Sequence, residues 1–251
     1  MEGTITRVEV AVAERTLLRI GAVSAILGVI TIFVANAFHG GNHPDDLEIV
    51  LPQYAVNANW EVVHIGQFLG YTLVFVALVA LYRSIAEGRG AELARLGYVT
   101  AILATAIFAV NQAVDGVAVK YDVADEWVSA SAAEKATALR VAEAVRHIEI
   151  GFSSFAELTL GAAHLLYGLA IGLSGAYPRR LGWAAVVVGI GWIVFGMLVV
   201  RKGFTQATLA TVVSTLLALW VVVLGVFLWR KSAKTPNLTG RVRSGRTSGG
   251  V

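Results

Sequence analysis

The run WEVVH, residues 60–64, places a carboxylate and an imidazole three residues apart at the start of a long apolar segment. On a helix, Glu61 and His64 would lie on one face, the spacing by which helix bundles present both groups to one metal ion. Further nitrogen and oxygen donors stand near the ends of neighbouring apolar segments. The sequence therefore offers a set of candidate metal ligands, which comprises His39, His43, Glu61, His64, Asp115 and His147.

The types of candidate ligand restrict which metal ions could bind. The chain contains no cysteine, which excludes thiolate metal sites, iron–sulfur clusters and cysteine nucleophiles. A shell of imidazole and carboxylate groups suits Zn²⁺, Fe²⁺ or Mn²⁺. Such an ion could polarise a carbonyl group or activate water, with Glu157 as the candidate general base. Polar and aromatic side chains at similar depth are the candidate binding residues for a small polar or lipidic ligand: Trp60, Gln67, Tyr71 and Asn111.

The same polar side chains allow three alternative functions. Two histidines at matching depth, His64 with His39 or His147, could hold a single b-type haem. Glu157 could instead bind a proton or cation in a proton-coupled transporter. In a non-catalytic accessory protein, these groups would only fix the register of the helices. No flavin or nucleotide motif is present, and the sequence does not decide whether the protein is an enzyme.

The composition is that of a membrane protein. The 251 residues are 57% hydrophobic and 15% charged, with a mean hydropathy of +0.70, whereas soluble domains carry about a quarter charged residues. About 20 apolar residues cross the hydrocarbon layer as one helix. The sequence predicts an all-α, six-helix transmembrane bundle, with spans at 17–38, 62–81, 96–117, 151–173, 183–200 and 207–229.

The distribution of charge predicts the orientation. Basic residues precede the first span, follow the sixth, and fill the second-to-third and fourth-to-fifth connections, whereas the first-to-second and third-to-fourth connections are acidic. Both termini are therefore predicted to be cytoplasmic. Residues 1–16 form the N-terminal segment, 17–230 the transmembrane domain and 231–251 a disordered basic tail. The net charge of +3 resides in loops and tail, so no nucleic-acid partner is expected.

The first span also resembles a secretion signal at its end. The run ANA, residues 35–37, has the small-residue pattern of a signal-peptidase site. However, the preceding apolar run is long enough to span a membrane and follows a long N-terminal segment of mixed charge. These features favour a first span that is retained.

Polar residues on three spans are predicted to converge. At 1.5 Å per residue, His64, Asp115 and Glu157 lie near the outer side of the second, third and fourth spans. An ionised group in hydrocarbon costs several kcal/mol, so these faces should turn towards one another. The sequence therefore predicts a polar chamber in the outer half of the bundle. The fourth helix, which starts at a capping box in residues 131–134, should extend beyond the outer face.

Glycines predict how the helices pack. Gly182, Gly189, Gly196 and Gly203 recur at every seventh position and give the fifth span a smooth stripe. Small residues at such spacing allow close approach of two helices. The stripe is predicted to serve packing within the bundle, and a homo-oligomer is a further option.

The segments ARLGYVTAILATAIFAVNQAVDGVAVK and AEAVRHIEIGF, together with residues 57–83, resemble a family of small bacterial multi-span membrane proteins of unknown function. The resemblance covers most of the chain between Leu17 and Arg230. It implies a location in the bacterial cytoplasmic membrane and carries no catalytic motif.

Overall fold

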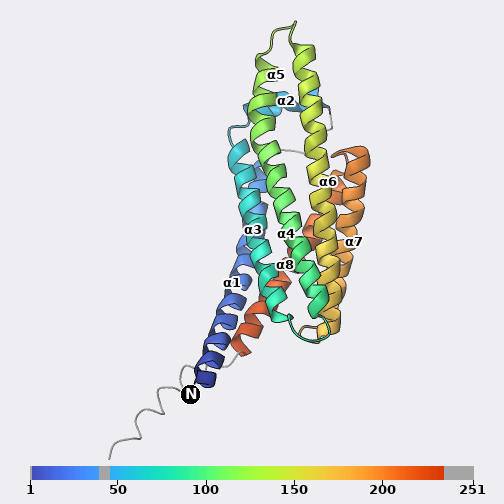
Figure 1. The fold of residues 1–251 in the computed structure, drawn as a ribbon. Coiled ribbons are helices and arrows are strands. Elements are labelled where there is room, and N and C mark those ends of the chain that lie inside the picture. The colour runs from blue at the N-terminus through green and yellow to red at the C-terminus, as the bar shows by residue number, and fades with distance from the viewer. Residues whose placement is uncertain (1, 40–45, 235–251) are drawn as a thin grey trace, which may run out of the picture.

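A computed structural model describes residues 2–39 and 46–234, with side chains from residue 9 onward, and over these ranges the chain is helical without strands (Figure 1). Six helices are long and apolar enough to cross a membrane. Five of them contain a predicted span in full, and the third predicted span, 96–117, begins in the third helix and continues into the helical segment that follows it, so the predicted all-α six-span fold is confirmed. The six helices are α1 (Glu2–His39), α3 (Trp60–Ser84), α4 (Ala91–Ala113), α6 (Lys135–Ser174), α7 (Arg179–Lys202) and α8 (Ala207–Lys234).

Three shorter elements were not foreseen from the sequence. α2 (Leu47–Val56) is a ten-residue helix that lies across the upper part of the bundle (Figure 1). After α4 the chain continues without a break as a π-helical segment, η1 (Val114–Asp125), and then as α5 (Glu126–Ser129). The third span therefore extends well past residue 117, where the apolar run ends. π-helical turns are uncommon and often lie at functional sites.

Two helical arms rise above the rest of the bundle. α6 has 40 residues, which corresponds to about 60 Å, twice the thickness of the hydrocarbon layer. Together with η1 and α5, it extends beyond the upper ends of α3 and α7 (Figure 1). At its start, the Glu134 carboxylate accepts hydrogen bonds from the backbone N–H and the hydroxyl of Ser131, at 3.0 and 2.6 Å. These bonds lower the pKa of Glu134. The predicted extension of this helix is confirmed.

The glycine stripe packs α7 against α6 of the same chain. A methyl group at Gly182 would lie 2.6 Å from the carbonyl oxygen of Gly168, and one at Gly189 would lie 2.6 Å from that of Gly161. Gly196 continues the row at 3.0 Å from the carbonyl oxygen of Ser154. The stripe thus forms an internal interface, while the fourth glycine, at 203, ends α7 with a φ of +63°.

α1 is an integral part of the bundle. It packs along α3 and α8, where Leu18, Ala22 and Ala25 are buried in the main core. At Gly225 of α8, an added methyl group would approach the Ala25 side chain to 3.0 Å. The first span therefore supplies core contacts that a chain cut after residue 37 would lose.

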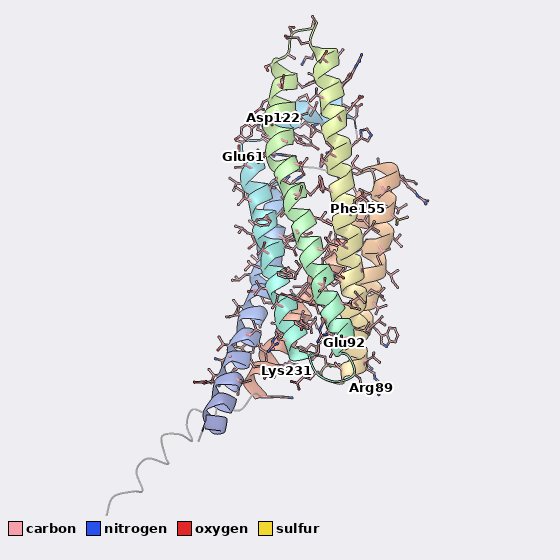
Figure 2. All side chains as sticks on the ribbon, viewed as in Figure 1. Glu61, Arg89, Glu92, Asp122, Phe155 and Lys231 are labelled. Atoms are coloured by element: carbon pink, nitrogen blue, oxygen red, sulfur yellow. The ribbon has the colours of Figure 1, made fainter. Side chains whose placement is uncertain are left out.

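The two ends of the bundle differ in charge. α1 begins at the end where α8 finishes (Figure 1). Arg89 and Lys231 lie at this end, whereas Glu61 and Asp122 lie towards the other (Figure 2). This asymmetry underlies the predicted cytoplasmic position of both termini. Of the predicted basic tail, residues 231–234 form the end of α8 and the rest lie outside the described ranges.

Candidate metal centre and polar chamber

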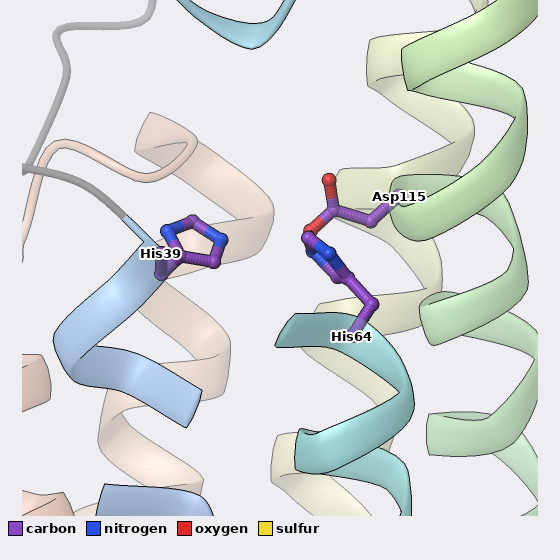
Figure 3. A group of neighbouring side chains, drawn as sticks. All are labelled: His39, His64 and Asp115. Atoms are coloured by element: carbon purple, nitrogen blue, oxygen red, sulfur yellow. The ribbon is translucent and has the colours of Figure 1, made fainter. Parts of the chain in front are cut away.

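Three of the predicted metal ligands come together. His39 is the last residue of α1, His64 lies in the second turn of α3, and Asp115 lies at the start of η1. One potential ligand atom from each residue lies within 4.8 Å of the others. Figure 3 shows His64 and Asp115 side by side, with the His39 ring facing them from the opposite side.

His64 and Asp115 form a close buried contact. Their Nε2 and Oδ2 atoms are 2.9 Å apart, and the side chains are 2% and 15% exposed. The other ring nitrogen of His64, Nδ1, lies 2.6 Å from the carbonyl oxygen of Trp60. Because a carbonyl oxygen only accepts, Nδ1 carries the proton. Nε2 is therefore the ring nitrogen that faces the carboxylate of Asp115.

Trp60 and Gly116 position this pair. The Trp60 Nε1–H group donates a 2.7 Å hydrogen bond to the carbonyl oxygen of Asp115, which ties α3 to η1. Trp60 is 1% exposed and is not among the residues that line the polar chamber. It therefore positions His64 and Asp115 and is not itself available to a ligand in the chamber. At Gly116, an added methyl group would lie 2.6 Å from Cβ of His64. No role for this glycine could be predicted from the sequence, because only the structure shows which helix it faces.

His39 completes the group from α1. Its ring centroid lies 5.2 Å from that of His64 and 4.9 Å from that of Trp60. Its carbonyl oxygen accepts a 3.4 Å hydrogen bond from the Asn57 side chain, which links the end of α1 to the start of α3. His39 therefore lies at a helix end that is hydrogen-bonded to the chain just before α3, the helix that carries His64.

Two of the remaining predicted ligands lie outside this group. His147 is exposed on α6, and its Nδ1 donates to the carbonyl oxygen of Glu143 at 2.7 Å. Glu61 is half-buried at the start of α3 and is not part of the group of three found in the described ranges. His43 lies outside the described residues. Among the described residues, the structure thus assembles His39, His64 and Asp115 without Glu61 and His147.

A polar chamber of about 290 Å³ adjoins the group. The predicted binding residues Gln67, Tyr71 and Asn111 line it, together with His39 and Asp115. Its further polar lining comes from Asn36, Tyr54, Gln112, Arg146, Glu149 and Ser153. Polar side chains from the second, third and fourth spans therefore meet at this chamber, but Glu157, which was predicted to converge with His64 and Asp115, is not among its lining residues.

Two amides in the chamber have buried oxygen atoms. Asn111 and Gln112 are 6% and 8% exposed. Their side-chain oxygens have no hydrogen-bond partner among the described residues. Gln67, by contrast, donates a 2.8 Å hydrogen bond to the side-chain oxygen of Asn36. A buried polar atom without a partner costs about 1–3 kcal/mol, so Asn111 and Gln112 mark a place for a ligand or water with a donor group.

An ion pair on α6 forms one wall. Nη1 of Arg146 lies 3.0 and 2.8 Å from the two carboxylate oxygens of Glu149, and the side chains are 11% and 4% exposed. The guanidinium also lies 4.7 Å from the ring centroid of Phe204. Glu149 was not among the predicted site residues, although its i,i+3 spacing from Arg146 is typical of an ion pair on a helix.

α2 covers the chamber through a small second core. Val50, Leu51 and Tyr54 of α2 pack with Trp60 and with residues of η1 and α6. The Tyr54 ring lies 4.2 Å from that of Trp60, and burial raises the pKa of Tyr54 to about 12, which keeps its hydroxyl protonated. The Lys120 ammonium donates to the carbonyl oxygen of Ala55 and, at 2.8 Å, to Asp125.

Glu157 lies beyond the chamber. It lines a separate cavity of about 90 Å³, where it accepts a 3.2 Å hydrogen bond from Ser153 and its second oxygen is buried. Tyr71 and Phe108, whose rings lie 4.1 Å apart, contribute to the walls of both cavities. Glu157 is therefore not beside the three candidate ligands, and its role as general base stays a prediction.

No protein family model matches the chain, and no curated protein and no solved structure is similar to it. The resemblance noted in the sequence stays a prediction. The geometry of the site is therefore the basis for a functional assignment.

Proposed function

We propose that this membrane protein binds one divalent transition-metal ion between His39, His64 and Asp115. The ion faces the polar chamber and presents an open coordination position to a ligand that arrives from the membrane. The leading role is metal-assisted chemistry on that ligand. In this role the ion acts as a Lewis acid on a carbonyl oxygen or activates a water molecule.

The contact between His64 and Asp115 carries the proposal. The histidine that binds a metal ion usually donates its other ring N–H to a backbone carbonyl or a carboxylate, which fixes the tautomer. His64 makes this bond to the carbonyl oxygen of Trp60 at 2.6 Å, so its Nε2 is the nitrogen left to face Asp115 and a bound ion.

The donor set suits a small number of ions. Two histidines and one carboxylate are the protein ligands of catalytic zinc sites and of non-haem Fe²⁺ sites, and both leave positions open. Around a tetrahedral zinc ion the ligand atoms would lie about 3.3 Å apart. The observed atoms lie within 4.8 Å, so a modest movement of His39, at the end of α1, would close the shell.

Haem fits this arrangement less well. A haem iron is bound by axial ligands on the two faces of the porphyrin. The Asp115 carboxylate already lies 2.9 Å from Nε2 of His64, where the porphyrin would need room. The contact therefore favours a bare metal ion.

Elemental analysis of the purified protein tests the proposal. We expect about one zinc, iron or manganese ion per chain, and a loss of most of this metal in H64A, D115N and H39A. The matched control is H147A, which removes an exposed histidine from α6 and should leave the metal content unchanged. Co²⁺ substitution provides a second measure, because its visible absorption reports the ligand geometry.

Other outcomes would overturn the proposal. A metal content near zero after purification without chelator and after reconstitution with each ion would rule out the site and favour the accessory function. A Soret band in the visible spectrum would assign the histidines to haem instead. Because the chain has no cysteine, thiolate binding does not complicate either measurement.

A further inference from the structure

An apolar groove of about 720 Å³ runs between α1, α3 and the first half of α8. Its α8 wall includes several small side chains, among them Ala210, Ser214 and Ala218, while Phe33 of α1 also lines it and is 78% exposed. All three helices are apolar enough to cross a membrane. The groove therefore opens towards the hydrocarbon of the bilayer.

The groove exists because α1 and α8 approach each other at one end only. Near Gly225 the two helices are in close contact, as an added methyl group would lie 3.0 Å from Cβ of Ala25. Towards the start of α8, the small side chains at 207, 210 and 214 leave the space between the helices unfilled. This end of α8 is also the end that reaches the polar chamber.

The groove and the chamber share a boundary. Tyr71, Gln67 and His39 line both, as do Asn36, Ala207 and Ala210. The apolar surface of the groove thus leads directly to a candidate metal ligand and to polar amides. An occupant that fills both spaces must have a hydrocarbon part and a polar end.

We propose that the groove binds the hydrocarbon chain of a single-chain lipid whose head group lies in the chamber. The head carries a carbonyl oxygen and a hydroxyl or amide hydrogen. The hydrogen would be donated to the buried oxygens of Asn111 and Gln112, and the carbonyl oxygen would face the His39–His64–Asp115 group. This inference rests on the proposed function for the last contact and names the class of its substrate.

The volumes favour one chain. Pockets for a single small ligand measure about 300–1,000 Å³, and the groove lies inside this range. The chamber, at about 290 Å³, accepts a compact head. Its polar lining includes an arginine that already binds Glu149, so the walls carry little uncompensated charge for a phosphate group. A neutral monoacyl lipid such as a monoacylglycerol has the required parts.

Photo-crosslinking in nanodiscs tests the inference with the full-length protein. The probe is monopalmitoylglycerol that carries a diazirine in mid-chain. We expect crosslinks on α1 and α8 within residues 29–37 and 207–222, and unlabelled monoacylglycerol should compete for them. S214W, which fills the groove, should reduce these crosslinks at least fivefold. L216W adds the same side chain two residues away, outside the groove lining, and should leave them unchanged.

A second variant tests the head-group contacts. N111L removes a buried amide from the chamber and should raise the monoacylglycerol concentration for half-maximal competition at least threefold. Labelling spread evenly over the lipid-facing residues of α7, such as Trp183 and Val187, or equal labelling of S214W and L216W, would overturn the inference.

Metal analysis of the same samples separates the two proposals. If wild-type protein contains the metal but shows no specific crosslinks in the groove, the lipid site is rejected and the metal site is retained. Specific groove labelling in a protein that binds no metal would retain the lipid site and reject the metal site.

Discussion

Gly116 of η1 lies directly against His64 of α3, since a methyl group at Gly116 would come within 2.6 Å of Cβ of the histidine. The atom that would be met is close to the backbone of His64, so it cannot move aside as the end of a flexible side chain could. The absence of a side chain at Gly116 therefore sets the distance between α3 and the helix that carries Asp115.

The first prediction concerns this contact. G116A should separate His64 from Asp115 and lower the affinity for the proposed metal ion about tenfold or more, the usual effect of disturbing the surroundings of metal ligands. Titration against a chelating dye measures the change. G151A is the matched control, because an added methyl group at Gly151 meets no atom within 4 Å. Equal affinities of wild type and G116A would show that the spacing of the two helices is not critical.

The second prediction concerns the ion pair in the chamber wall. R146M should destabilise the protein by about 3–5 kcal/mol, because it leaves Glu149 buried without its cation. The double variant R146M/E149L should lose less than the sum of the two single changes. The free energy of unfolding in mixed detergent micelles measures both.

The exposed pair on α4 provides the control for that cycle. Arg95 and Glu92 have the same i,i+3 spacing, but their side chains are 60% and 78% exposed. The same substitutions there should change stability by about 0–1 kcal/mol. Additive losses at Arg146 and Glu149 would contradict a coupled buried pair.

The third prediction concerns the cover of the chamber. Lys120 binds a carbonyl oxygen near the C-terminal end of α2, where a cation is favourable because the last carbonyl groups lack partners in the helix. K120M should therefore speed amide hydrogen exchange in residues 50–56 about tenfold. K202M, at the exposed end of α7, should leave this segment unchanged. Unaltered exchange in K120M would show that hydrophobic packing alone holds α2.

The spans and the depth of the polar residues could be predicted from the sequence. Hydropathy and a constant rise of 1.5 Å per residue are enough to place His64, Asp115 and Asn111 near one level. Their meeting follows from the cost of exposing such groups to lipid. The rise per residue gives the depth of a side chain but not the rotation of its helix about the helix axis.

The rotation of α6 shows the difficulty. His147 was the predicted metal ligand on this helix, whereas Arg146, Glu149 and Ser153 are the α6 residues that line the chamber. The reason is the close contact with α7, which turns the Ser154 side of α6 towards Gly196 and exposes His147. Two neighbouring faces of α6 carry polar residues that could point into the bundle. Which of them does so depends on where the partner helices lie.

α2 and η1 could not be predicted for other reasons. α2 has only ten residues and contains Pro52, so its sequence resembles a connection. η1 continues a helix with wider turns past the end of the apolar run, and its hydrogen-bonding pattern has no simple sequence signal. Both elements are held by contacts with distant parts of the chain.

The order of the site residues along the chain bears on how the protein is made. His39, His64 and Asp115 all belong to the first three spans, whereas Arg146, Glu149 and Phe204, which wall the chamber, belong to later segments. Since synthesis proceeds from the N-terminus, the ribosome delivers all three donors to the membrane before the enclosure around them exists. Binding of the proposed ion could therefore precede enclosure, and the last helices to insert would then close the chamber around the three side chains.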